Sequence, residues 1–330
     1  MDFFQIINDI AKVDPEVYDR FDTRRAAFRN FVGFGKKVSA TALPLAVSTL
    51  FSKAYGQGAA LPPLVIATLK LALQLEYLEF FFYDTALSSA SSLGLTPDER
   101  RAFEIIRNDE QLHINTLRAA LSADAGSPLT RADFDYTGSQ NLRRNSLGAA
   151  PLFTALGGTT APTTGGFTDK AVFLTVAQNF VDTGVRAYKG GAPNLNTNTT
   201  KDILEVALNI HSVEARHSSR IRSIRRGGIQ STSAPKSWIT PDDTATATPL
   251  PNNGVPNTPS QVSPYLAGAT AAYPIESNTN QGTPPVDVQT LVPSGGSSTA
   301  GAEAFDEPLD ADTVKAIAKN FAANPTALFN

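Results

Sequence analysis

The sequence contains no cysteine, and only three of its 330 residues are histidines. The lack of cysteine excludes disulfide bonds, iron–sulfur clusters, thiolate zinc sites and cysteine nucleophiles. Any bound metal ion must therefore be held by oxygen and imidazole ligands, which suit iron, manganese or zinc. Charged residues are also scarce, at 18%, and the net charge is −3. Nothing in this composition indicates nucleic acid as a partner.

Long apolar runs are missing from the N-terminal segment 1–60. Its apolar run, Val38 to Phe51, follows the basic groups Thr23-Arg24-Arg25 and Lys36-Lys37 and is shorter than the roughly 20 residues of a membrane-spanning helix. A basic flank before a short apolar run is typical of an export signal, here of the twin-arginine kind. We expect residues 24–51 to contact a membrane or the export machinery, which places the protein in the cell envelope, the periplasm or outside the cell. If this segment is instead a structural helical arm, the protein is cytoplasmic.

Four helical patterns occupy residues 61–228, at about 62–92, 96–124, 168–191 and 199–228. The second begins with Thr96-Pro-Asp-Glu99, a capping box with proline at the first helical position. Gly190-Gly191 is expected to end the third. The first connection is a tight turn, the last is about ten residues long, and the middle one, 125–167, is long. Two antiparallel helix pairs joined by one long crossover form the ferritin-like version of the four-helix bundle, so the expected fold class is all-α.

Two short motifs repeat the pattern Glu-x-x-His: Glu110-Gln-Leu-His113 and Glu214-Ala-Arg-His217. Residues three apart share one face of a helix, so each pair can present its carboxylate and imidazole to the same ion. Both pairs lie on apolar stripes, and Glu76 lies on another. A buried carboxylate must be paired, protonated or bound to metal. We therefore predict a site that holds one or two iron or manganese ions. The alternative is a set of Glu–His hydrogen bonds that remains from an ancestral metal site.

The segment from 61 to 226 resembles a ferritin-like family that includes plant and bacterial desiccation-related proteins. The resemblance is carried by four motifs: Leu73-Gln-Leu-Glu-Tyr-Leu-Glu79, Asp109-Glu-Gln-Leu-His113, Asp182-Thr-Gly-Val-Arg-Ala-Tyr-Lys-Gly190 and Val213-Glu-Ala-Arg-His217. The N-terminal segment and Ala304-Phe-Asp-Glu-Pro-Leu309 resemble bacterial members with a twin-arginine-like leader. The resemblance implies a four-helix bundle that binds two metal ions. It implies no specific reaction, because the biochemical activity of that family is poorly defined.

One position departs from the family pattern, in which a glutamate usually precedes the aspartate that corresponds to Asp182. This chain has Val181 there, so we expect the fourth carboxylate of the site to be lost and Asp182 to form an exposed pair with Arg186. The predicted metal ligands are Glu76, Glu110, His113, Glu214 and His217, with weaker candidates Glu79, Asp182 and Gln178. Glu79 is expected to be partly exposed. Packing is the favoured role of Tyr77, Tyr83 and Tyr188, and the alternative is that they hydrogen-bond the ligands or carry radicals.

The composition changes in the C-terminal region, 229–330. No lysine or arginine occurs from Ser237 to Val314, and prolines lie among Thr, Asn, Ser and Gly. Such a stretch cannot form a packed core of its own, but its singly spaced apolar residues suit an extended strap that covers the bundle or a neighbouring subunit. A short capped helix is expected near Asp310 to Phe321. From Ser237 onward, nine acidic and two basic residues give −7, which leaves +4 for the rest. Opposite charges favour contacts between copies through the terminal arms.

Two functions remain open at this stage. The first is a ferritin-like metal protein of the cell envelope, associated with stress, whose iron or manganese reacts with dioxygen or peroxide. The second is a structural protein that uses the bundle as a building block and its arms for homo-oligomeric or homo-polymeric contacts, without catalysis. The two Glu-x-x-His motifs favour the first, whereas Val181 and the long terminal regions favour the second.

Overall fold

A computed structural model of the chain describes residues 61–138, 167–227, 237–240, 243, 264–265, 270–291 and 300–330. The chain divides into two units, Met1–Leu50 and Phe51–Asn330, and all the described residues belong to the second. The predicted export signal or arm at 1–60 lies outside the described residues, as does the middle of the long crossover.

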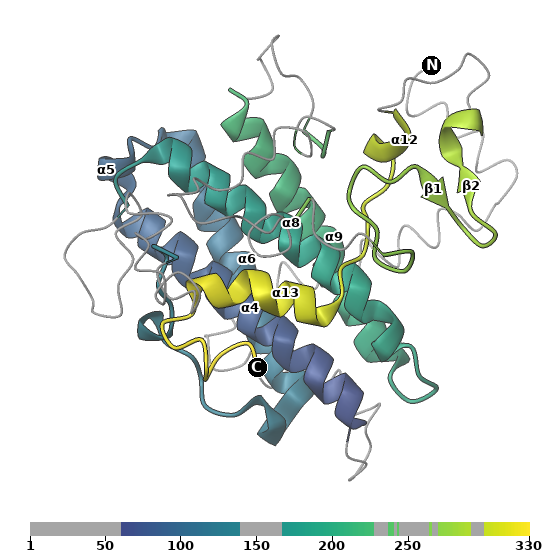
Figure 1. Cartoon of the computed structure of the whole chain (residues 1–330). Coiled ribbons are helices and arrows are strands. Elements are labelled where there is room, and N and C mark those ends of the chain that lie inside the picture. Colours follow the sequence, from purple (N-terminus) through teal and green to yellow (C-terminus); the bar gives the residue numbers. More distant parts are fainter. Residues whose placement is uncertain are drawn as a thin grey trace, which may run out of the picture. The chain divides into compact units, whose positions relative to one another are not determined.

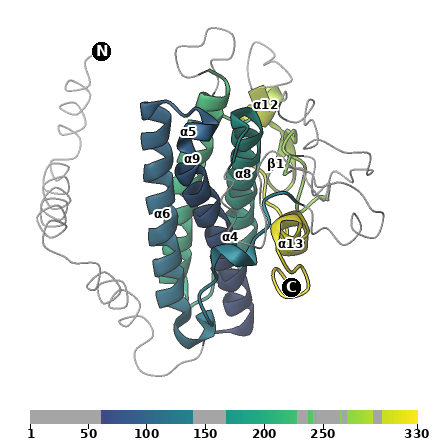
Figure 2. The same ribbon diagram turned by 90° about the vertical axis from the view of Figure 1, so that its left-hand side faces the viewer.

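Four long helices form the bundle: α4 (Pro63–Ser88), α6 (Pro97–Leu121), α8 (Lys170–Leu195) and α9 (Lys201–Arg225). Helix α4 packs against α6, α8 packs against α9, and α4 also packs against α8. The four helices run side by side in Figure 2. The predicted all-α ferritin-like bundle is therefore confirmed. No helix within the described ranges combines the length and the apolar character needed to cross a membrane.

The first helix pair is closed by the local signals read from the sequence. A one-turn helix, α5 (Ala90–Leu93), follows α4 and ends at Gly94, whose positive φ of 64° suits a residue without a side chain. At the start of α6, the Thr96 hydroxyl accepts from the Glu99 N–H and the Glu99 carboxylate accepts from the Thr96 N–H. The predicted capping box is thus present, and it fixes where α6 begins.

Helix α8 does not end at Gly190-Gly191, which corrects the expected boundary. The helix continues past Pro193 to Leu195. A Cβ atom placed on Gly190 would lie 1.9 Å from the Leu309 carbonyl oxygen. Glycine at this position therefore allows the C-terminal segment to approach the helix backbone, rather than marking the end of the helix.

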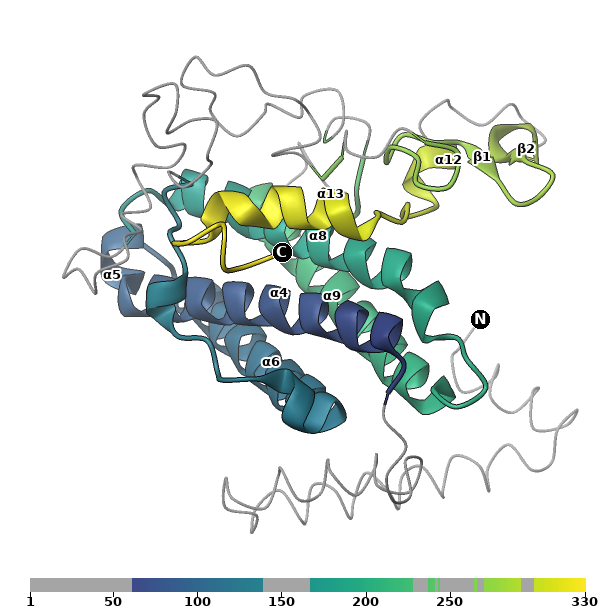
Figure 3. The ribbon, with the colours of Figure 1, turned by 60° about the horizontal axis from the view of Figure 1, so that its bottom comes forward.

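The C-terminal region adds small elements to the bundle. They are the strands β1 (Asn280–Gln281) and β2 (Val286–Asp287), paired antiparallel, and the helices η4 (Val288–Leu291), α12 (Ala300–Glu303), α13 (Ala311–Ala318) and η5 (Lys319–Phe321). Helix α13 is capped by Asp310 and packs against α8 and α4 (Figures 1 and 3). The described parts of the strap thus contact the bundle of the same chain.

The long crossover and the end of the chain are joined to each other. Between α6 and α8 the crossover forms η1 (Ser122–Ala125) and η2 (Arg131–Asp133). Phe134 then forms a β-bridge with Ala322, beside a hydrogen bond from the Asp135 N–H to the Phe321 carbonyl (2.8 Å). The Tyr136 hydroxyl donates to the Leu78 carbonyl of α4 (2.8 Å). These contacts hold both segments on the same face of the bundle.

Candidate metal centre

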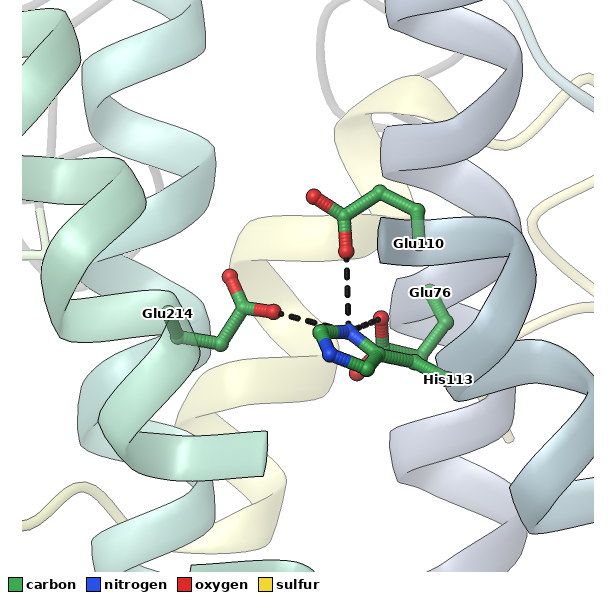
Figure 4. Close-up of side chains that lie close together, drawn as sticks. All are labelled: Glu76, Glu110, His113 and Glu214. Atoms are coloured by element: carbon green, nitrogen blue, oxygen red, sulfur yellow. Dashed lines mark hydrogen bonds and ion pairs between the residues drawn. The ribbon is translucent and has the colours of Figure 1, made fainter. Parts of the chain in front are cut away.

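Three helices bring four polar side chains together inside the bundle. Glu76 comes from α4, Glu110 and His113 come from α6, and Glu214 comes from α9 (Figure 4). One ligand atom from each lies within 4.8 Å of those of the other three, and all four residues are buried. Helix periodicity explains the convergence, because each of these residues continues an apolar stripe that faces the core.

The cluster is centred on a single nitrogen, His113 Nδ1. It lies 3.0 Å from Glu76 Oε2, 3.0 Å from Glu110 Oε2 and 3.2 Å from Glu214 Oε1. An imidazole nitrogen carries at most one proton, so it cannot satisfy three carboxylates as a hydrogen-bond donor. Glu214 Oε1 is buried and has no hydrogen bond despite this short distance. Three oxygens and one nitrogen thus face a common centre, as ligand atoms do around a cation.

The second predicted histidine, His217, faces the same carboxylates from the other side. Its Nδ1 lies 3.2 Å from Glu110 Oε1 and 3.6 Å from Glu214 Oε2, and none of these three atoms has a hydrogen bond. Its Nε2 lies 3.1 Å from Asp109 Oδ2. A carboxylate at Nε2 favours a proton on that nitrogen and leaves the Nδ1 lone pair directed at the cluster. His217 is therefore oriented as a metal ligand.

Burial and mutual repulsion shape the electrostatics of the cluster. Burial raises the pKa of Glu76 to about 8. Burial would also raise the pKa of Glu214, but the nearby His113 and His217 outweigh it and lower that pKa to about 2. For His217, Asp109 and the cluster glutamates overcome the effect of burial and raise the pKa to about 12. Without a cation, the cluster therefore retains protons at neutral pH, and a metal ion would replace them.

Three residues outside the main ligand set support the cluster. The Tyr188 hydroxyl donates to Glu76 Oε1, and the Tyr83 hydroxyl donates to Glu79 Oε2 (3.3 Å). The sequence favours packing for both tyrosines, but the structure shows the alternative role, a hydrogen bond to a glutamate. Asp109, which holds His217, was not singled out for a role, although it directly precedes Glu110. Its placement follows from the meeting of α6 and α9, which no pattern within one helix reveals.

Glu79 is buried, which corrects the expectation of partial exposure. It lies in the middle of α4 and only 5% of its surface is accessible. Burial, followed by the charges of Glu214, Glu110 and Glu76, raises its pKa well above the ordinary value. Glu79 therefore lies close to the cluster and adds a fourth buried glutamate to it.

Asp182 and Gln178, the other weaker candidates, belong to a different polar network. Asp182 is buried and accepts from Arg222, Ser218 and Tyr265. The expected exposed pair of Asp182 with Arg186 is therefore wrong; Arg186 is itself buried and pairs with Glu276 at 2.8 Å. The Gln178 amide donates to the Tyr265 hydroxyl (2.9 Å) and its oxygen accepts from Arg225 (3.1 Å).

The donor set fits iron or manganese. Its ligand atoms are carboxylate oxygens and imidazole nitrogens, which suit these ions. The buried oxygens of Glu214, Glu110 Oε1 and His217 Nδ1 have no hydrogen bond, and buried polar atoms without partners are costly. Bound cations would satisfy all of these atoms at once.

Comparison with known families identifies the bundle. Residues 65–226 match a family model described as a ferritin-like domain. This range contains the four bundle helices almost completely and all the residues of the cluster. No curated protein and no solved structure is significantly similar to the chain.

Proposed function

Because residues 65–226 form a ferritin-like domain around a buried carboxylate–histidine cluster, we propose that the protein binds iron or manganese ions and carries out a redox reaction with dioxygen or peroxide. The proposal rests on one observation above all, the convergence of three carboxylate oxygens on His113 Nδ1. A bound ion of this kind supplies one-electron redox chemistry, which no side chain of the cluster provides.

In this proposal, the side chains of the cluster bind the metal ion, and neighbouring side chains hold these ligands in orientation. Glu76, Glu110, His113 and Glu214 form the first set of ligands. Asp109 fixes the imidazole of His217 through Nε2, and Tyr188 holds Glu76 through a hydrogen bond. Partners that orient ligands in this way raise metal affinity. Burial of the cluster excludes bulk water, which strengthens every electrostatic contact within it.

Metal titration tests the binding step. The purified chain, stripped of metal, is incubated with Mn²⁺, desalted and subjected to elemental analysis. We expect at least one ion per chain in the wild type and a large loss in His113→Gln. His211→Gln is the matched control, because His211 is not part of the four-residue cluster. A wild-type chain that retains no Mn²⁺, and no Fe²⁺ under anaerobic conditions, would refute the proposal.

The redox step needs its own measurement. After anaerobic loading with Fe²⁺, exposure to dioxygen should oxidise the bound iron faster in the wild type than in His113→Gln, as followed by absorbance and by oxygen consumption. Equal rates in both chains would show that oxidation occurs in solution, and would limit the function to metal binding.

A scaffold role is the second candidate, in which copies of the chain assemble without catalysis. It is favoured by large apolar side chains on the outside of the bundle: Ile105 and Leu112 on α6 are each 46% exposed, and Leu208 on α9 is 45% exposed. The first two are seven residues apart and share one helix face. Light scattering of the wild type and of Ile105→Ser/Leu112→Ser tests this role, which predicts an oligomer that the double variant disrupts.

Location at the cell envelope and a role under desiccation or related stress are separate proposals. The location is supported by the basic flank and short apolar run within residues 24–51. The role in stress is supported only by the resemblance to desiccation-related proteins. Fractionation of the producing cells, with N-terminal sequencing of the protein, tests the location. Survival of a deletion strain after drying tests the role in stress.

A further inference from the structure

The two central carboxylates of the cluster each face two imidazoles. Glu110 lies 3.0 Å from His113 Nδ1 through Oε2 and 3.2 Å from His217 Nδ1 through Oε1. Glu214 lies 3.2 Å from His113 Nδ1 through Oε1 and 3.6 Å from His217 Nδ1 through Oε2. Each carboxylate thus turns one oxygen to each histidine, which is the placement of groups that bridge two cations.

The position beside His217 has unsatisfied ligand atoms of its own. Glu110 Oε1, Glu214 Oε2 and His217 Nδ1 are all buried, and none has a hydrogen bond. The ion that the first four residues would hold has His113 Nδ1 as a ligand and uses the other oxygen of each glutamate, Glu110 Oε2 and Glu214 Oε1. A second cation would give the three remaining atoms a common partner, and buried polar atoms without a hydrogen bond cost about 1–3 kcal/mol each.

Helix α8 supplies no carboxylate to this second position. Its one acidic residue, Asp182, is held by Arg222 and Tyr265 in the neighbouring network. Val181 is buried and apolar. Gly184, one turn from Val181, lies against the cluster but has no side chain, so α8 leaves a space there.

Glu79 from α4 fills that space. A Cβ atom placed on Gly184 would lie 3.3 Å from Glu79 Oε1 and 3.9 Å from Glu214 Oε2, so both oxygens flank the same point of α8. The other oxygen of Glu79 accepts from Tyr83, which fixes the carboxylate. Glu79 is thus buried, and its Oε1 lies beside the same point of α8 as Glu214 Oε2, an atom of the second position.

We propose that Glu79 supplies the fourth carboxylate of a two-ion centre, from α4 instead of α8. The ligands of the second divalent transition-metal ion are Glu79, Glu110, Glu214 and His217. Helix α4 then contributes Glu76 to one ion and Glu79 to the other, and Gly184 provides the room. This inference rests on the proposed metal-binding function, because it concerns the same cluster.

Mn²⁺ loading with two readouts tests the role of Glu79. The number of ions per chain is measured by elemental analysis, and the coupling between ions by electron paramagnetic resonance. We expect two coupled Mn²⁺ ions in the wild type, and one isolated Mn²⁺ ion in Glu79→Gln. Glu104→Gln, a change on the outer face of α6, should still bind two. Circular dichroism and a melting curve establish that each variant is folded.

Two further variants separate ligation from a merely structural effect. Gly184→Val should exclude the second ion by filling the space between Glu79 and Glu214, while the first ion remains bound. Glu79→Ala/Gly184→Asp moves the carboxylate from α4 to α8, and should restore the second ion that Glu79→Ala alone loses. A structural role for Glu79 predicts no such rescue.

The possible results distinguish this inference from the proposed function. A wild-type chain that binds no metal would overturn both. One ion bound with equal affinity by the wild type and Glu79→Gln would overturn the role of Glu79 and leave the proposed function intact. Two coupled ions in Glu79→Gln would also overturn it, because the second ion would then not need this carboxylate.

Discussion

Asp109 is not a predicted metal ligand, but it sets the orientation and the tautomer of His217, which is one. His217 Nε2 lies 3.1 Å from Asp109 Oδ2, and this contact leaves Nδ1 facing Glu110 and Glu214. Without Asp109, the imidazole loses its fixed orientation and its preferred tautomer. The contact joins α6 to α9 and so ties the geometry of the site to the packing of these two helices.

We expect Asp109→Ala to weaken Mn²⁺ binding about 10- to 100-fold, the usual effect of losing a partner that orients a metal-bound histidine. The affinity is measured by calorimetric titration of the metal-free chain. Asp98→Asn, on the same helix but outside the cluster, is the control and should bind as the wild type does. Unchanged affinity in Asp109→Ala would show that His217 needs no orienting partner.

Glu76 makes the stability of the metal-free protein depend on pH. Its pKa in the folded chain is raised to about 8 by burial, from an ordinary value of 4.5. Between these two pH values the unfolded chain releases a proton that the folded chain retains, so stability falls as the pH rises from about 4.5 to about 8. His217, whose pKa is raised to about 12 from 6.5, adds a decrease in the same direction above pH 6.5.

The metal-free wild type should therefore melt at a lower temperature at pH 8 than at pH 5. Glu76→Gln removes one of the titrating groups, so the difference between its two melting temperatures should be smaller. Saturating Mn²⁺ should also reduce the difference, because bound metal replaces the retained protons. An identical pH dependence in the wild type and Glu76→Gln would contradict the assignment of a raised pKa to Glu76.

At the scale of elements, α8 is the helix that connects the metal centre to the strap. Tyr188 reaches Glu76 in the core, whereas Arg186 reaches outward to the C-terminal region. The buried guanidinium of Arg186 pairs with Glu276 and donates to the carbonyls of Glu307, Pro264, Pro274 and Pro308. The Leu309 N–H donates in turn to the Arg186 carbonyl (3.1 Å). One helical turn therefore anchors three separate segments of the strap.

The two adjacent glycines of α8 give a matched test of this anchoring. Gly190→Ala would place a methyl group against the Leu309 carbonyl oxygen, so the strap must shift, whereas Gly191→Ala would place one 2.9 Å from a methyl group of the Thr68 side chain, within the bundle. We expect Gly190→Ala to destabilise the chain by about 1–3 kcal/mol. Gly191→Ala should cost less, because the gain in helix propensity of up to about 1 kcal/mol offsets the shift of Thr68. Urea unfolding measures both. Equal effects would show that the strap does not rest on the backbone of α8.

At the scale of the whole molecule, much of the bundle could be predicted from the sequence. The capping box at Thr96 and the apolar stripes through Glu110 and Glu214 are local signals, and they gave the helix order and the members of the cluster. The prediction that α8 ends at Gly190-Gly191 is wrong. A glycine pair is a local signal for a helix end, whereas here Gly190 makes room for Leu309, which is distant in the chain.

The contacts between helices could not be predicted in the same way. The spacing of Asp182 and Arg186 predicts an exposed pair, but the strap covers that face and supplies Tyr265 and Glu276 as their partners. The pattern of α4 alone likewise predicts partial exposure of Glu79, whereas the glycine at 184 on α8 lets this side chain be buried between the helices. In both cases the deciding residue lies on another segment, and helix periodicity carries no information about it.

The most direct test of the metal centre is anomalous X-ray diffraction from crystals of the Mn²⁺-loaded chain, collected on both sides of the manganese absorption edge. We expect an anomalous peak inside the bundle, among Glu76, Glu110, His113 and Glu214, and a second peak beside His217 and Glu79. Saturating Mn²⁺ with no anomalous peak within this cluster would contradict this expectation.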